Sequence, residues 1–88
     1  MPLVDHARLM AMSDEDFLAE CLEEGGALYN AVRSQNEHQV EWAKLDGFPD
    51  VPSYLEHTAE VCERDGSYRS LTLARAIRLG AITGIPPK

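Results

Sequence analysis

The residues of this chain best suited to metal chemistry are its three histidines and two cysteines. Helical di-iron sites place a Glu three residues before a His, so that both ligands face inward from one helix. Here the order is reversed, because His38 precedes Glu41 and His57 precedes Glu60. Cys21 and Cys62 are far apart, without a Cys-x-x-Cys pair, and each falls on the apolar side of a helical pattern. We therefore expect neither a metal site nor another cofactor.

Covalent and phosphoryl-transfer chemistry lack their usual motifs. The sequence has no Gly-x-Ser-x-Gly elbow, and Gly25-Gly26 is not followed by the Lys and Ser or Thr of a phosphate-binding loop. No cysteine has the electropositive surroundings that activate a thiol. A chain of 88 residues also leaves little room for a concave pocket of several hundred cubic ångströms. These observations favour a protein that is not an enzyme.

Charge is distributed unevenly along the chain, whose formal net charge is −7. Met1 to Glu63 carries a net charge of −11, whereas Arg64 to Lys88 carries +4. An acidic body and a basic last helix can attract each other within one domain. Alternatively, one face is built to meet a charged partner.

The basic C-terminal part supports a DNA-binding alternative. Residues 59–82 combine a helical pattern, a glycine-containing turn and a basic helix, which is the outline of a helix-turn-helix. In that arrangement the side chains that would contact bases or phosphates are Arg69, Ser70, Thr72 and Arg75. The acidic remainder of the chain opposes binding to a polyanion. DNA binding is therefore the alternative rather than the first hypothesis.

A second cluster of charge is acidic and belongs to one short helix. It consists of Asp14, Glu15, Asp16, Glu20, Glu23 and Glu24. Such a surface can imitate a phosphate backbone and occupy the nucleic-acid channel of another protein. It can equally be a solvated helix face whose first turn complements the helix dipole.

Hydrophobic periodicity predicts an all-α fold, a small compact bundle of four to five short helices in a single domain over residues 1–88. We expect helices over residues 3–12, from a Ser13 cap to Gly25-Gly26, over 27–46, over 54–64 from a Ser53 cap, and from Ser67 or Ser70 to about residue 79. Prolines and glycines predict a loop over residues 47–52 and an extended tail over 83–88. Arg69, Arg75 and Arg78 are expected on the outer side of the last helix.

The long third helix contains the most informative polar interval, residues 34–39. The interval breaks the apolar stripe at Gln35 and at either His38 or Gln39, where core positions would fall. The helix could extend past the edge of the core there, could kink, or could present a polar binding surface.

Together these patterns predict a small acidic protein-binding module, a stoichiometric regulator or inhibitor that occupies a partner protein's surface. The partner could be a nucleic-acid-binding protein, and such proteins are often encoded by phages or mobile elements. Aromatic residues and arginine carry much of the binding energy at interfaces. The expected partner-binding residues are Gln35, His38, Gln39, Trp42, Arg69, Arg75 and Arg78. The thin core makes a homodimer plausible. Without a signal-peptide or membrane-span pattern, we expect a cytoplasmic protein with reduced thiols.

Overall fold

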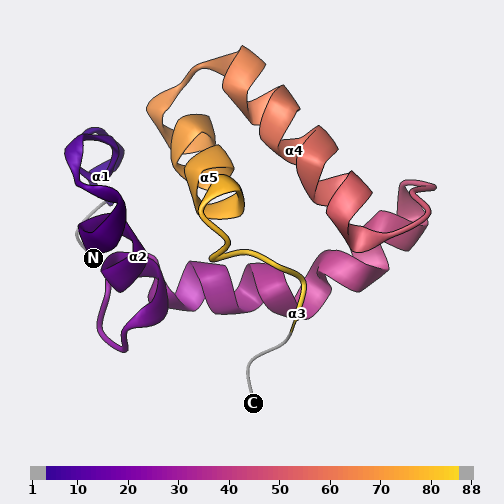
Figure 1. Cartoon of the computed structure of the whole chain (residues 1–88), viewed down its shortest axis with the longest axis horizontal. Helices are drawn as coiled ribbons and strands as arrows, with labels where there is room; N and C mark the ends of the chain where they lie inside the picture. Colours follow the sequence, from indigo (N-terminus) through magenta and orange to yellow (C-terminus); the bar gives the residue numbers. More distant parts are fainter. Residues whose placement is uncertain (1–3, 86–88) are drawn as a thin grey trace.

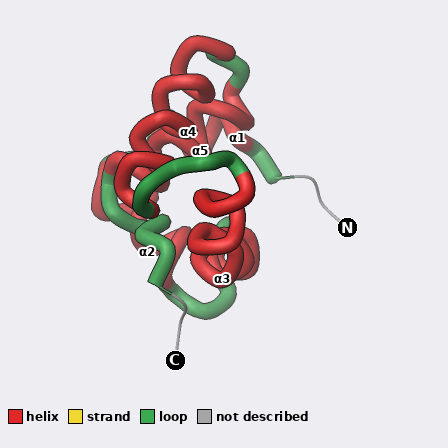
Figure 2. The backbone as a smooth tube through the Cα atoms, turned by 90° about the vertical axis from the view of Figure 1, so that its right-hand side faces the viewer, coloured by secondary structure: helices red, strands yellow, loops and turns green. Residues whose placement is uncertain are grey.

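The computed structural model describes residues 4–85, which form five α-helices and no strand within that range. The helices are α1 (His6–Ala11), α2 (Asp14–Leu22), α3 (Tyr29–Leu45), α4 (Val51–Asp65) and α5 (Tyr68–Arg78). Figure 2 shows the described chain as helices joined by loops alone. The predicted all-α bundle is confirmed. No helix of the described residues is long and apolar enough to span a membrane.

Local signals set several helix ends where the sequence predicts them. The Ser13 side chain accepts a hydrogen bond from the Asp16 backbone N–H at 3.2 Å and begins α2. Ser67 caps α5 in the same way, through the Ser70 backbone N–H at 3.3 Å. Gly66, with φ of 73°, takes the left-handed position that ends α4. These three boundaries depend on contacts within a few residues, and at α5 the structure selects Ser67 over the alternative cap, Ser70.

The start of α4 differs from the prediction. Asp50 is its N-cap and accepts from the Ser53 backbone N–H at 2.8 Å, so Ser53 lies inside the helix rather than capping it. Pro52 belongs to the first turn, where its missing N–H would have no partner within the helix anyway. The expected loop therefore ends before Val51. The Ser53 N–H also holds the pKa of the Asp50 carboxyl below its usual value.

The helices pack around one core beneath α5. In Figure 1, α3 crosses below the other helices, and α5 lies between the α1–α2 pair and α4. α4 and α5 run in opposite directions, joined by a short turn, and form the most extensive helix pair. The connected core cluster comprises Leu9, Phe17, Cys21, Leu28, Val32, Leu55, Ala76, Ala81 and Ile82. Phe17 is fully buried at its centre, between the N- and C-terminal helices.

Arg75 connects α5 to the junction between α1 and α2. Its guanidinium donates to the Leu9 and Met12 carbonyls at 2.8 and 2.6 Å and pairs with Asp14 at 3.0 Å. It also lies over the Phe17 ring, 4.6 Å from the ring centroid. The expected outward position of Arg75 is wrong, because the end of α1 leaves backbone carbonyls that a neighbouring arginine can satisfy.

The C-terminal segment covers the polar interval of α3. Asn36 donates from its amide to the Ala81 carbonyl at 3.1 Å and accepts from the backbone N–H groups of Thr83 and Gly84 at 2.8 and 3.0 Å. α3 is continuous through the interval, and Gln39 is only 2% exposed. The helix therefore neither breaks nor passes beyond the core there. Residues 83–85 are non-helical, but Asn36 anchors them, and residues 86–88 lie outside the described part of the chain.

Gln39 is the one buried amide that lacks a full set of partners among the described residues. Its amide nitrogen donates to Gln35 Oε1 at 2.9 Å, whereas its own Oε1 is buried without a hydrogen bond. A buried acceptor in this state costs about 1–3 kcal/mol. Replacing Gln39 with Leu is therefore expected to raise the free energy of unfolding by about 1 kcal/mol, measured by urea denaturation. Gln39→Glu buries a charge in the same volume and should lower the free energy of unfolding. Destabilisation by both variants would contradict this account.

Candidate functional site

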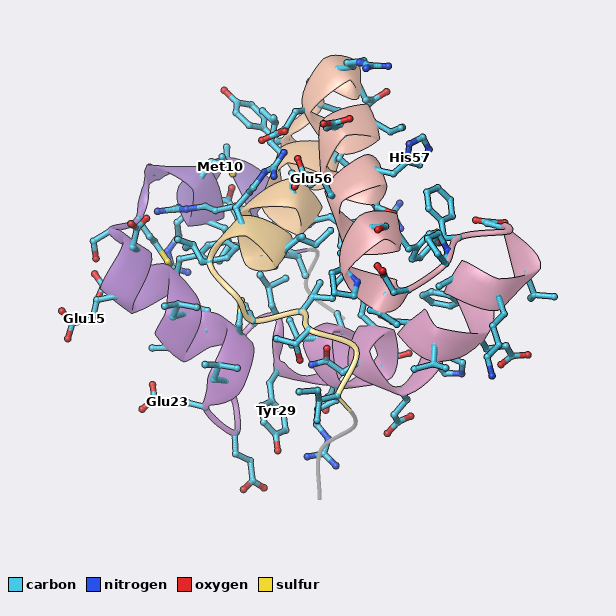
Figure 3. The ribbon with its side chains drawn as sticks, turned by 45° about the vertical axis from the view of Figure 1, so that its right-hand side comes forward. Met10, Glu15, Glu23, Tyr29, Glu56 and His57 are labelled. Atoms are coloured by element: carbon cyan, nitrogen blue, oxygen red, sulfur yellow. The ribbon has the colours of Figure 1, made fainter. Side chains whose placement is uncertain are left out.

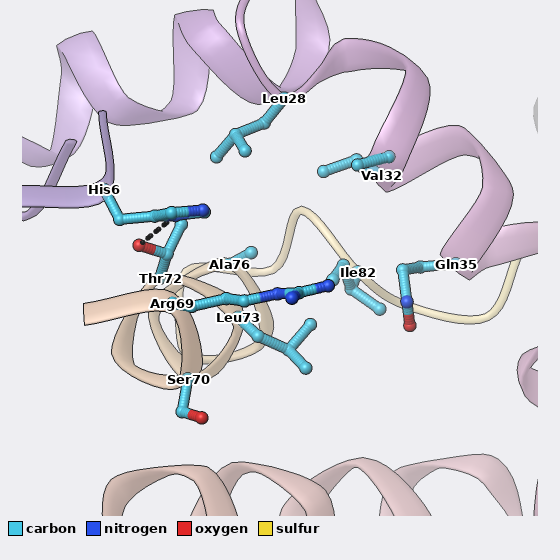
Figure 4. Close-up of a pocket in the computed structure, with 11 residues that line it drawn as sticks. His6, Leu28, Val32, Gln35, Arg69, Ser70, Thr72, Leu73, Ala76 and Ile82 are labelled. Atoms are coloured by element: carbon cyan, nitrogen blue, oxygen red, sulfur yellow. Dashed lines mark hydrogen bonds between the residues drawn. The ribbon is translucent and has the colours of Figure 1, made fainter. Parts of the chain in front are cut away.

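A hollow of about 270 Å³ opens between α1, α3 and α5. Its apolar wall consists of Leu28, Ala31, Val32, Leu73, Ala76 and Ile82, and its polar groups belong to His6, Gln35, Arg69, Ser70 and Thr72 (Figure 4). We call it the His6–Arg69 hollow. It is slightly smaller than the roughly 300–1,000 Å³ of most small-molecule pockets. A single side chain or a small organic group suits this size better than a large cofactor.

His6 is fixed in orientation by α5. Its Nδ1 lies 3.1 Å from the hydroxyl of Thr72, which in turn donates to the Tyr68 carbonyl at 2.8 Å. A hydroxyl has one proton to donate, and we place the proton of Thr72 on its bond to the Tyr68 carbonyl. On that basis we assign to His6 the tautomer with its proton on Nδ1, in which Nε2 is the acceptor. Figure 4 shows the ring projecting into the hollow from α1.

Arg69 supplies the positive charge of the hollow. It is exposed, and its side chain extends across the opening toward Gln35 of α3 (Figure 4). No carboxylate among residues 4–85 comes within ion-pair distance of it, whereas Arg75 and Arg78 are both paired. A second, more open hollow continues past His6 and Arg69 and is lined also by Val4 and Ala27. The two hollows therefore form one groove with a cationic group in its middle.

The same flank of α3 carries an aromatic pair. The rings of His38 and Trp42 stack with centroids 5.2 Å apart and an interplanar angle of 18°. His38 Nδ1 also lies 2.7 Å from the Ser34 carbonyl. Both side chains are half-buried, and Leu45, one turn farther along, is 75% exposed. Gln35 and Ala31 occupy this flank one and two turns before His38, so the aromatic pair lies on the same side of α3 as these lining residues of the groove.

The predicted partner-binding residues divide into three groups. Gln35 and Arg69 line the hollow, and His38 with Trp42 lies beside it. Arg78 is on the surface but is paired with Glu56 and Glu63 of α4. Gln39 and Arg75 are committed to internal contacts. His6 was not among the predicted residues, because a single histidine in a short helix gives no pattern and only the fold brings it to Arg69.

The acidic cluster is partly used within the fold. Asp14 pairs with Arg75, and Glu20 accepts from the Ala27 backbone N–H at 3.1 Å. Glu15 and Glu23 point away from the body of the protein (Figure 3). The remaining exposed carboxylates lie on α2 and just beyond its end, at Glu15, Asp16, Glu23 and Glu24, and the first two complement the dipole at the start of the helix.

The α4–α5 hairpin leaves few side chains for contact with DNA. Of the four residues expected to face bases or phosphates, Thr72 is 3% exposed and Arg75 is bonded to α1. Only Arg69 and Ser70 remain near the surface, and both line the hollow. A recognition helix needs a row of accessible polar side chains, so this geometry gives the DNA-binding alternative little support.

The two thiols are placed for packing. Burial raises the pKa of Cys21 to about 11, and burial also raises that of Cys62. Both cysteines are free of a disulfide. A protonated, desolvated thiol is a weak nucleophile and a weak metal ligand. Within the described residues, moreover, no three His, Cys, Asp or Glu side chains gather closely enough to hold a metal ion.

Comparison of the chain with models of protein families, with curated proteins and with solved structures finds no match.

Proposed function

We propose that this chain is a protein-binding module that regulates or inhibits its partner by occupying part of the partner's surface. The observation that carries the proposal is Arg69, an arginine without an ion pair among residues 4–85, at the edge of an apolar hollow. Arginine is enriched among the hot-spot residues of interfaces, and here it stands beside an apolar surface that a side chain of the partner can cover. The adjoining His38–Trp42 pair adds the large amphipathic surface that such interfaces favour.

The groove fits binding better than catalysis. It holds one imidazole whose Nδ1 is occupied by Thr72, and neither cysteine belongs to it. A nucleophile would need an adjacent base held by a third group. The groove instead offers apolar walls with a few polar groups, which can fix the orientation of a bound segment.

A photo-crosslinking amino acid at Ala31 tests this proposal directly, because Ala31 is exposed and lines both parts of the groove. In a lysate of the source organism, or of its host if the gene is phage-borne, we expect one discrete protein adduct that nuclease does not remove. The matched control places the same group at Glu60, which is exposed on α4 and lies outside the groove. Equal adducts from both positions, or an adduct that nuclease removes, would contradict the proposal.

The captured protein then has to bind through the groove when purified. Arg69→Glu is expected to weaken its affinity by about tenfold or more, as for a residue within an interface hot spot. Arg64→Glu is the control, since Arg64 is an exposed arginine of α4 away from the groove. If the two variants bind equally well, Arg69 is not part of the interface.

A further inference from the structure

The His6–Arg69 hollow presents hydrogen-bond donors and an acceptor at separate places. The acceptor is Nε2 of His6, because Nδ1 donates to the Thr72 hydroxyl. The donors are the guanidinium of Arg69 and the amide NH₂ of Gln35, whose oxygen is already occupied by Gln39. A complementary ligand therefore carries an anionic acceptor for Arg69 and Gln35 and an N–H donor for His6.

The remaining wall sets the apolar part of the ligand. Leu28, Val32, Leu73, Ala76 and Ile82 form the apolar part of the lining of this open hollow of about 270 Å³. A ligand that meets all of these groups brings an apolar side chain, a carboxylate and an N–H close together. An internal Asp or Glu does not meet this requirement, because its carboxylate stands where the apolar group should be.

We propose that the hollow binds the C-terminal residue of a partner polypeptide that ends in an apolar side chain. The side chain fills the apolar part, the free α-carboxylate meets Arg69 and the Gln35 amide, and the residue's own N–H donates to His6 Nε2. The positive charge of Arg69, unpaired among the described residues, is complementary to a chain terminus. The proposal rests on the protein-binding function above and specifies which part of the partner enters the groove.

The test uses three peptides and NMR titration of the ¹⁵N-labelled full chain at physiological salt. The first is acetyl-Gly-Ala-Leu with a free carboxylate, the second its C-terminal amide, and the third the same sequence extended by Gly-Gly so that leucine is internal. We expect the free acid to shift the amide resonances of Leu28, Ala31 and Arg69. The amide and the extended peptide should bind at least about tenfold more weakly, because each lacks the charge-assisted bonds at that position.

Variants of the protein show whether the named groups are responsible. Arg69→Gln should lower the affinity of the protein for the free-acid peptide by about tenfold or more. The variant should also bind the free acid no more tightly than the C-terminal amide. Arg64→Gln should change neither, and an unchanged melting temperature for both variants excludes unfolding as the cause. Equal affinity for the acid and the amide, or for the extended peptide, would overturn the proposal. The crosslink from Ala31 reports on protein binding independently of these peptides, so the two proposals can fail separately.

Discussion

Arg75→Met is expected to lower the free energy of unfolding by about 2–4 kcal/mol, the largest effect of any surface-accessible cation in this fold. The side chain is only 16% exposed and bonds to backbone carbonyls of Leu9 and Met12 that end α1. Methionine keeps much of the apolar stem, but it removes the donor to the Met12 carbonyl, leaves the Leu9 carbonyl with only the Met12 N–H at 3.4 Å, and removes the cation from the Phe17 ring. Urea denaturation followed by circular dichroism measures the loss.

Two companion substitutions make the Arg75 result specific. Arg75→Lys retains the charge without the planar fork, so an intermediate loss is expected. Arg78→Met is the matched control, because Arg78 pairs with Glu56 and Glu63 at the surface, where solvent screens ion pairs and their loss costs little stability. A loss for Arg78→Met as large as that for Arg75→Met would show that net charge, and not the bonds to α1, is what stabilises the fold.

Gly26→Ala is expected to destabilise the protein by about 2–3 kcal/mol, because a β-carbon has no room at that position. It would lie 2.3 Å from the Glu20 carbonyl oxygen, which is backbone and cannot move aside without disturbing α2. The same carbonyl accepts from the Leu28 N–H at 3.0 Å and so helps to hold the start of α3. Thermal and urea denaturation of the two proteins measure the difference.

Gly25→Ala provides the control for the adjacent position. Gly25 has φ of 88°, and a β-carbon there would meet nothing within 4 Å. Its substitution should therefore cost only the strain of a left-handed alanine, about 1–2 kcal/mol. If Gly26→Ala lowers the free energy of unfolding no more than Gly25→Ala does, the backbone can move away from the added β-carbon at little cost, and the prediction is wrong.

Sequence patterns predict those parts of the fold that depend on near neighbours. Ser13, Gly66 and Ser67 act through bonds to residues two to four positions away. The Ser13 cap is predicted correctly, and Ser67 is the one that is used of the two candidate caps, Ser67 and Ser70. At the start of α4, Asp50 and Ser53 are both good caps, and the sequence does not show which is used. The tertiary packing of Val51 onto the core accompanies the earlier start.

Residues that act across the fold could not be placed in this way. Periodicity indicates that Arg75 is polar within α5, but not that the end of α1 lies beside it. In the same way, Gln39 interrupts an apolar stripe without any sign that residues 81–84 cover it. The hollow combines side chains of α1, α3 and α5, and the sequence does not show that these helices meet. Gln35 and Arg69 were therefore predicted as separate binding residues, and His6 was not predicted. The roles of these residues in binding a partner stay predictions.

The anchoring of residues 81–84 by Asn36 also constrains how the protein is made. A ribosome releases α1, α2 and α3 first, and the nascent chain can form these helices as they emerge. The α3 surface around Asn36 and Gln39 nevertheless stays exposed to solvent until Ala81, Thr83 and Gly84 leave the exit tunnel. The core therefore closes only at the end of synthesis of this domain, and ribosomes stalled before residue 81 should carry a protease-sensitive intermediate.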